Sequence, residues 1–268
     1  MAPGFKTAPC PIFSISPMTT MSKLSAKTAS TAAPEKEKEP LARPEQKGSS
    51  GSTKACTKGC TKGRPRTFDR EEALQKALRI FWELGYEPAS VAAICKAIGI
   101  NPPSFYAAFG SKETLFLEAV RYYEKTYWTG LLTEFEKSRL PIAQALRIFF
   151  EKAAAVLLNP ATPNGCMVVL AAVNISPKET QILALVKDLR RATRDFFARR
   201  LARAVREGEL ASSLDIEGLA DMLNIFLEGM SIQARDGLAL TSLAKAADPV
   251  IALFASLAQK SAAQKHST

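Results

Sequence analysis

Apolar residues recur every three or four positions from Phe68 to about residue 262, which is the spacing of helices that bury one face. This part of the chain has no strand-like alternation of apolar and polar residues and no long β-branched run. Residues 1–61 show no sustained apolar period and are rich in Pro, Ser, Thr, Ala and Lys. Such a segment cannot offset the entropy lost on ordering. We therefore expect a disordered basic tail followed by an all-α fold of about nine helices.

The first two predicted helices have clear ends. Asp69 with Glu72 resembles a capping box, and the apolar period that follows stops at Gly85, a residue type that commonly ends helices. Ser90 is suited to cap a second, shorter helix that ends at Gly99. These signals predict two helices separated by a short loop.

A third helix follows almost at once. Asn101 is suited to cap it, Pro102 fits the first helical position because its missing N–H would be unpaired there, and Gly110 closes it. Two short helices joined by residues 99–101 have the geometry of a helix-turn-helix, whose second member enters the major groove of DNA. The same spacing also occurs in helical proteins that do not bind DNA.

The rest of the chain is predicted to form longer helices. Ser111 is expected to cap one that runs to Glu136. Further helical segments are predicted at 141–158, 166–175, 178–207, 215–236 and 241–260. The last two are unusually apolar for surface helices, which fits packing against a second copy of the chain. They could equally complete the core of a single chain.

Positive charge is concentrated near the N-terminus. Residues 1–66 carry twelve Lys or Arg and four Glu, a net charge of +8, so the other 202 residues carry only +2 of the total of +10. A basic flexible tail on a near-neutral body indicates a polyanionic partner. For residues 1–53 the alternative is that the charge only keeps the protein soluble.

Several classes of protein do not fit the sequence. The first twenty residues contain four prolines and do not resemble a signal peptide, and the five scattered cysteines fit a reducing compartment better than a disulfide framework. We therefore expect a cytoplasmic protein with no membrane partner. Cys56 and Cys60 could supply two metal ligands, but the only histidine is His266. With no glycine-rich phosphate loop and no nucleophile elbow either, we expect no cofactor and no enzyme activity.

One continuous stretch carries a family resemblance. Its features are Gly85 with Tyr86, Ser90, Gly99 with Ile100, and the run Ser104, Phe105, Tyr106, Phe109, Ser111, Lys112 and Glu113. In this order and spacing, residues 63–120 resemble the DNA-binding domain of TetR family repressors. Asn164, Gly165 and Cys166 followed by an apolar helix resemble the second half of that family less closely.

The resemblance implies a domain organisation and a function. A three-helix DNA-binding domain is expected at 62–111, a helical ligand-binding and dimerisation domain at 112–262, and a disordered C-terminus at 263–268. The implied function is that of a repressor at the nucleoid, which binds double-stranded operator DNA as a homodimer and is released by a small-molecule inducer. The alternative is an architectural dimer that binds DNA with weak specificity and needs no ligand.

The resemblance also places base contacts at the start of the third helix, on Pro102, Pro103 and Ser104. None of these can make the bidentate contacts by which Arg, Lys, Asn or Gln read guanine and adenine. We therefore expect largely apolar base contacts, with added specificity from Asn101, water and DNA shape. Ser90 is expected to contact DNA as well.

Phosphate contacts are expected from Tyr106, which points away from the domain core, and from Lys112, which lies at a helix start. Between Thr67 and Ser111 the chain has four basic and five acidic residues, so phosphate attraction must come from the edges of the domain. Arg64 and Arg66 form a basic arm directly before the first helix. This arm is suited to a narrow minor groove or, alternatively, to plain phosphate contact.

Large side chains in the second half could line an inducer pocket. The candidates are Trp128, Phe149, Met167 and Phe197, although residues of these types at helical spacing are more often core. Cys166 could act as a thiol sensor, or it could be a small buried cysteine.

Overall fold

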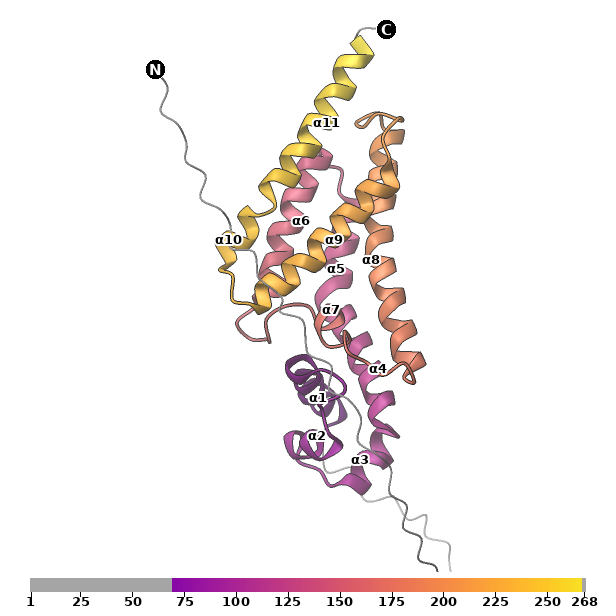
Figure 1. Cartoon of the computed structure of the whole chain (residues 1–268), viewed down its shortest axis with the longest axis vertical. Coiled ribbons are helices and arrows are strands. Elements are labelled where there is room, and N and C mark those ends of the chain that lie inside the picture. Colours follow the sequence, from indigo (N-terminus) through magenta and orange to yellow (C-terminus); the bar gives the residue numbers. More distant parts are fainter. Residues whose placement is uncertain (1–68, 267–268) are drawn as a thin grey trace, which may run out of the picture. The chain divides into compact units, whose positions relative to one another are not determined.

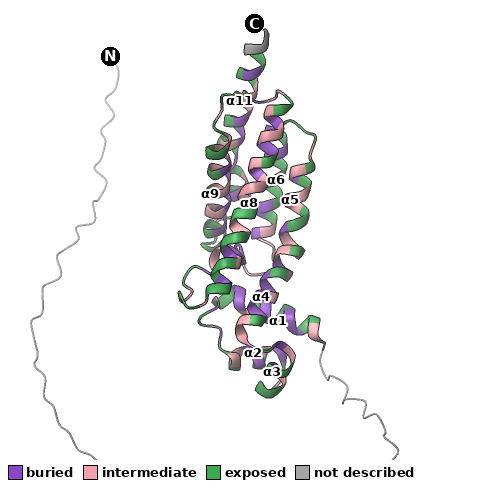
Figure 2. Ribbon diagram, turned by 90° about the vertical axis from the view of Figure 1, so that its right-hand side faces the viewer, coloured by how far each residue is buried: buried purple, intermediate pink, exposed green. Residues whose placement is uncertain are grey.

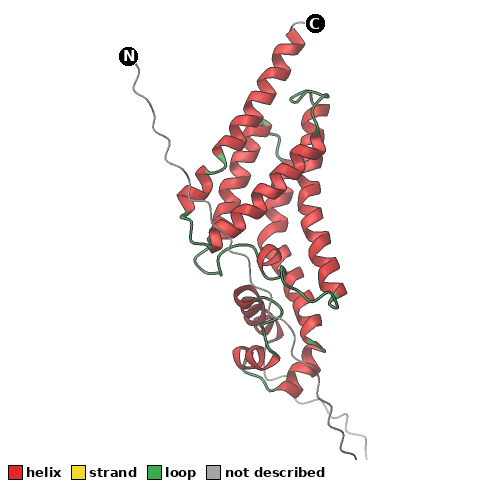
Figure 3. Cartoon of the chain, in the orientation of Figure 1, coloured by secondary structure: helices red, strands yellow, loops and turns green. Residues whose placement is uncertain are grey.

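All regular structure in the described part of the chain is helical (Figures 1 and 3). The computed structural model describes the backbone of residues 69–266 and the side chains of residues 69–263. The expected tail at 1–61 and the arm residues Arg64 and Arg66 lie outside the described residues. The all-α fold predicted from the apolar period is confirmed.

The helix-turn-helix region has the predicted elements. Helix α1 spans Arg70–Leu84, α2 spans Val91–Ile98 and α3 spans Pro102–Phe109. Gly99, between α2 and α3, has a left-handed backbone with φ of 83°, which reverses the chain after α2. These three helices form the compact unit that presents α3.

Side-chain caps explain why the helices begin where they do. The carboxylate of Asp69 accepts from two amides of the first turn of α1, Ser90 Oγ accepts from the Ala93 amide, and Asn101 Oδ1 accepts from the Ser104 amide. Each bond satisfies an N–H group that has no partner inside the helix. The capping box expected at Asp69 is only half formed, because the carboxylate of Glu72 pairs with Lys76 at 2.8 Å.

The helix predicted from Ser111 to Glu136 is interrupted. Helix α4 (Lys112–Tyr123) leads into a π-helical turn, η1 (Glu124–Trp128), and then into α5 (Thr129–Lys137). A π-turn accommodates an extra residue and shifts the side chains that follow it around the helix axis. Apolar periodicity does not reveal this turn, because the pattern of a single helix continues on both sides of it.

Six helices complete the described part of the chain. They are α6 (Ile142–Leu157), α7 (Met167–Leu170), α8 (Thr180–Arg206), α9 (Ile216–Arg235), α10 (Leu240–Lys245) and α11 (Asp248–His266). If α4 to α5 and α10 to α11 are each counted as one interrupted helix, residues 69–266 contain the nine helices expected.

Three predicted boundaries need correction. The segment 166–175 is helical only at the single turn of α7. The segment 241–260 is two helices, because Pro249 cannot donate to the preceding turn and lies instead in the first turn of α11. Helix α11 also continues to His266, past residue 262, where a disordered end was expected.

An aromatic cluster lies at the centre of the helical bundle that follows α4. Phe149 packs against Phe135, Phe150 and Phe197 with ring centroids 5.0, 5.3 and 5.2 Å apart, and Phe150 packs against Phe226 at 5.1 Å. These rings join α5, α6, α8 and α9, and Figure 2 shows buried positions along the inner faces of the helices. Edge-to-face packing of this kind stabilises a core beyond its buried area alone.

Residues 164–171, here called the junction segment, connect α1 to the later helices. Trp82 Nε1 donates to the Gly165 carbonyl at 2.9 Å, and the Tyr86 amide donates to the Ala171 carbonyl at 3.2 Å. Arg235 of α9 donates to the carbonyls of Trp82 and Asn164 at 2.9 and 3.1 Å. The junction segment therefore binds both the last turn of α1 and the loop that follows it.

Gly165 of the junction segment has no room for a side chain. Its φ is +83°, and a Cβ at this position would lie 2.4 Å from Leu170 Cδ1 and 2.7 Å from the Ser231 carbonyl oxygen. Gly165→Ala is therefore expected to lower the free energy of unfolding by at least about 3 kcal/mol, measured by chemical denaturation.

Gly237→Ala is the matched control for Gly165→Ala. Gly237 has a similar φ of +91° but no atom within 4 Å of its Cβ position, so only the left-handed backbone cost of about 1 to 2 kcal/mol is expected. Equal losses in the two variants would show that the close packing around Gly165 does not contribute.

Candidate DNA-binding surface and ligand cavity

Helix α3 has one buried and one exposed face. Phe105 and Phe109 are buried in the core of the three-helix unit, whereas Pro102 and Pro103 are exposed and the Tyr106 side chain is 52% exposed. Phe105 and Phe109 lie one turn apart and pack together with centroids 5.8 Å apart. Two buried aromatic anchors thus hold α3 while its first turn and Tyr106 face outward.

The side chains that cap α2 and α3 are exposed to solvent. Ser90 and Asn101 are both exposed, and each accepts a hydrogen bond from its own helix. The Ser90 hydroxyl keeps its proton for donation while its oxygen accepts, and the Asn101 side chain keeps its NH₂ group. Both residues therefore retain donors for DNA.

Lys112 has a structural role that the sequence does not show. Its ammonium donates to the Tyr86 carbonyl at 3.1 Å and to the Glu87 carbonyl at 3.5 Å, and it lies 4.2 Å from the centroid of the Tyr86 ring. An ammonium has three donors, so one remains for a phosphate. Lys112 thus links the start of α4 to the loop after α1.

Basic side chains in the three-helix unit are largely neutralised within the protein. Three of the four between residues 69 and 111 form ion pairs: Arg70 with Glu118, Lys76 with Glu72, and Arg79 with Glu83. The Arg70 pair is bidentate, at 2.6 and 2.9 Å. The surface around α3 therefore offers little free positive charge of its own.

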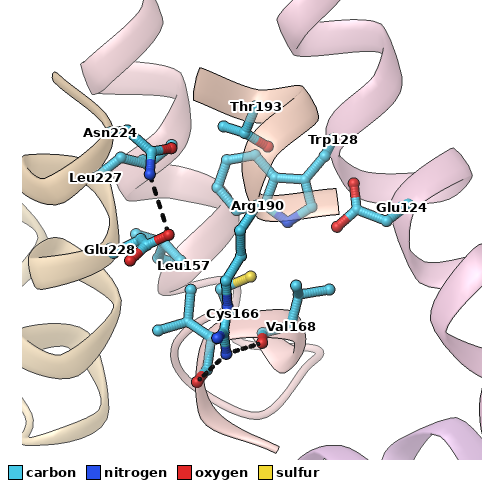
Figure 4. Close-up of a pocket in the computed structure, with 11 residues that line it drawn as sticks. Glu124, Trp128, Leu157, Cys166, Val168, Arg190, Thr193, Asn224, Leu227 and Glu228 are labelled. Carbon is cyan, nitrogen blue, oxygen red and sulfur yellow. Dashed lines mark hydrogen bonds between the residues drawn. The ribbon is translucent and has the colours of Figure 1, made fainter. Parts of the chain in front are cut away.

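A small cavity lies among η1, α8, α9 and the junction segment (Figure 4). Its volume is about 30 Å³, close to the share of one water molecule in the liquid. The residues that line it are Glu124, Trp128, Leu157, Cys166, Val168, Val169, Arg190, Thr193, Asn224, Leu227 and Glu228.

Of the four side chains predicted to line a pocket, Trp128 alone lines this cavity. Phe149 and Phe197 belong to the aromatic cluster of the core, with their ring centroids 5.2 Å apart. Met167 is buried nearby, and its amide donates to the Tyr123 hydroxyl at 3.3 Å. Large apolar side chains at helical spacing do not distinguish a core from a pocket wall, so ligand contact by Phe149, Met167 and Phe197 stays a prediction.

The polar groups of the cavity were not predicted from the sequence. Arg190 Nη2 donates to the carbonyls of Val168 and Val169 at 2.7 and 3.2 Å, and Asn224 Nδ2 donates to Glu228 Oε1 at 3.1 Å. Arg190 Nε and Asn224 Oδ1 are buried without a hydrogen-bond partner among the described residues. The sequence signal for a polar cavity wall is Asn224, a polar residue within the apolar run of α9.

Glu124 is the acidic group most affected by this environment. In Figure 4 its carboxylate points toward the cavity beside the indole of Trp128. Among the side chains described, those of residues 69–263, Glu124 forms no ion pair, and its carboxylate has no hydrogen bond to these residues. Burial without a compensating cation disfavours the charged form and raises the pKa of Glu124 to about 7.

Cys166 is buried in the same wall. Burial raises the pKa of its thiol to about 11, with the Tyr123 hydroxyl acting in the opposite direction. The thiolate is the form that is oxidised or alkylated, and it is scarce at neutral pH when the pKa is raised. The environment of Cys166 therefore favours a buried structural cysteine over a thiol sensor.

Comparison with known proteins identifies the family. Residues 73–119 match the family described as bacterial regulatory proteins, tetR family, and residues 143–247 match the tetracyclin repressor-like C-terminal domain. The HTH-type transcriptional repressor ComR of Escherichia coli K12 is 32% identical over 198 residues, which covers 72% of this chain and 92% of ComR. This chain belongs to the TetR family.

Other relatives of this TetR family regulator agree. The repressor BdcR of E. coli K12 is 30% identical over 67% of this chain and 86% of its own length. A structure of the TetR family regulator CifR with 26-bp double-strand operator DNA has a TM-score of 0.66 and 34% identity, and the match covers 70% of this chain and 98% of CifR. By its family and its relatives, this chain is a transcriptional regulator and not an enzyme.

Replacing Glu124 by Gln tests the cost of its burial. Because the folded pKa is raised above the ordinary value of 4.5, the carboxylate destabilises the TetR family protein progressively as pH rises from about 4.5 through about 7. Glu124→Gln is therefore expected to increase the free energy of unfolding by about 2 to 3 kcal/mol above neutral pH and by little at low pH, measured by denaturant titrations across this range.

Glu151→Gln provides the control for Glu124→Gln. Glu151 is exposed on α6 and makes only a 4.0 Å contact with Arg147. Its replacement should change the free energy of unfolding by less than about 0.5 kcal/mol at every pH. A stabilisation by Glu124→Gln that does not depend on pH would contradict the assignment to the carboxylate charge.

Proposed function

We propose that this TetR family regulator is a repressor that binds double-stranded operator DNA as a homodimer in the cytoplasm. In this proposal a small-molecule inducer enters the cavity among η1, α8, α9 and the junction segment and releases the DNA. The exposed first turn of α3, backed by buried Phe105 and Phe109, is the observation that supports DNA binding. The operator complex of CifR supports the same function by similarity.

In this proposal the first turn of α3 enters the major groove. Pro102 and Pro103 would contact bases through apolar surfaces such as thymine methyl groups, while Asn101 and Ser104 supply hydrogen bonds. Ser90, Tyr106 and the third donor of Lys112 would contact phosphates.

The arm at Arg64 and Arg66 would supply the charge that the three-helix unit lacks. This assignment is supported by the ion pairs that neutralise Arg70, Lys76 and Arg79 within the protein. The proposal has two forms: the arm contacts DNA through the minor groove, or it contacts phosphates alone.

Selection of operator sequences from random DNA by the purified protein tests the proposed function. The expected result is one enriched, pseudo-palindromic sequence, as a symmetric dimer requires. Enrichment of no sequence, together with a steep decrease of affinity with salt, would instead support the architectural DNA binder.

Tyr106→Phe tests the phosphate contact of α3. Removing the hydroxyl should weaken binding about tenfold on the selected operator and on unrelated DNA alike, because a phosphate contact carries no sequence information. Fluorescence anisotropy with both DNA molecules measures this. Tyr127→Phe, a tyrosine of η1 remote from α3, should leave both affinities unchanged, and a loss confined to the operator would assign Tyr106 to base readout.

The homodimer is proposed to form through α9 and α11. Ile225 and Ile232 of α9 are 69% and 49% exposed, and Leu253 of α11 is 40% exposed. The segment Leu240–Ala263 is apolar and long enough to cross a membrane by composition alone, and only 22% of its most apolar window is buried. Exposed apolar helices of this kind fit a partner surface formed by a second copy of the chain.

Ile225→Arg tests this interface. A charge at its centre should raise the dimer dissociation constant at least about thirtyfold and yield monomers at micromolar concentration in light scattering. Val173→Arg is the matched control, because Val173 is 65% exposed but lies outside α9 and α11. If Ile225→Arg remains as dimeric as Val173→Arg, the proposed interface is wrong.

A further inference from the structure

The cavity beside η1 combines apolar walls with the Glu124 carboxylate, which forms no ion pair with the described side chains. Resting on the proposed function, we propose that its ligand is a small organic cation, a protonated amine with a short apolar body whose ammonium pairs with Glu124. Trp128, Leu157, Val168 and Leu227 supply the apolar walls. An aromatic ring beside a carboxylate is a combination that attracts ammonium groups.

The Glu124 carboxylate is the group that would recognise the cation. Glu124 forms no side-chain ion pair or hydrogen bond with any residue between 69 and 263, the range in which side chains are described. A partly buried charge without a partner is unfavourable, and an incoming cation reduces that cost. The buried Oδ1 of Asn224, which also lacks a partner, would accept a second N–H of the same amine.

An anionic ligand is disfavoured although Arg190 lines the cavity. Arg190 Nη2 already donates to the carbonyls of Val168 and Val169, and its buried Nε, which has no partner among the described residues, can donate to a neutral acceptor as well as to an anion, so the charge of the lining decides. Figure 4 shows Arg190 between Glu124 on one side and Glu228 on the other. With both carboxylates ionised the lining carries one excess negative charge, which a single ammonium neutralises and a carboxylate ligand would double.

A metal ion is disfavoured by the arrangement of the same groups. Within the described residues, no three His, Cys, Asp or Glu side chains come together as metal ligands. Figure 4 shows Glu124 and Glu228 on opposite sides of Arg190. An organic ammonium needs only one carboxylate and apolar walls, which the cavity provides.

The size of the cavity restricts the ligand and requires its walls to move. About 30 Å³ is less than even a short alkylamine occupies, so binding must displace lining residues. Glu124 and Trp128 are the two ends of η1, which directly continues α4. A displacement of this wall therefore acts on the helix that starts at Lys112, next to α3.

Calorimetry with three probes of equal length tests the proposed ligand class. n-Butylamine, 1-butanol and butyrate are titrated into the full-length protein without DNA at about pH 8. Butylamine is expected to bind at least about tenfold more tightly than 1-butanol, and butyrate more weakly than either. Glu124→Gln should abolish the preference for butylamine and leave 1-butanol unchanged, whereas Glu151→Gln should behave as wild type.

The pH dependence gives a readout that a merely structural role of Glu124 would not produce. Butylamine stays protonated near neutral pH, while Glu124 must ionise to pair with it. Its affinity should therefore rise as pH increases from about 6 to about 8, by up to about tenfold per unit, and level off above. Cys166, Arg190 and Glu228 face the same cavity and Tyr123 adjoins it, so loss of the pH dependence in Glu124→Gln assigns it to Glu124.

Three outcomes would overturn the inference: tightest binding of butyrate, equal binding of amine and alcohol, or no binding of any probe at millimolar concentration. The first would make Arg190 the recognition group. Operator binding is measured separately by anisotropy. If the protein binds no operator but binds butylamine through Glu124, the proposed function fails while the ligand class stands.

Discussion

The hydrogen bond from the Trp82 indole to the Gly165 carbonyl is the contact on which the rest of the structure depends. Trp82 is buried at the end of α1, and Gly165 belongs to the junction segment, so this 2.9 Å bond joins parts of the chain that are far apart in sequence. Gly165 can take this place because it has no side chain and adopts a positive φ. Without this bond, the indole N–H would be buried and unpaired.

The junction segment contacts both functional parts of the protein. Its carbonyls at Gly165 and Ala171 bind Trp82 and Tyr86 on the side of the DNA-binding unit. Its carbonyls at Val168 and Val169 bind Arg190, which lines the cavity. The junction segment thus contacts both the DNA-binding helices and the cavity wall. It physically connects these two parts of the protein.

Features set by local chemistry could be predicted from the sequence, and features set by distant neighbours could not. The caps at Asp69, Ser90 and Asn101 act within a few residues, so the starts of α1, α2 and α3 can be predicted from the local sequence. The π-turn η1 and the contact of Lys112 with the Tyr86 carbonyl depend on packing against other elements. Glu124 has no sequence signal, because a glutamate on a helix is usually a solvated side chain.

The π-turn places a carboxylate and an indole in the same cavity wall. Glu124 and Trp128 are its first and last residues, and both line the cavity. Burial at this point holds the carboxylate in a state of raised free energy, as its pKa of about 7 indicates. A ligand can shift a conformational equilibrium only by its difference in affinity between two states. A cation that pairs with Glu124 gains this difference where the carboxylate is buried, so the same residue provides both recognition and the free energy for the response.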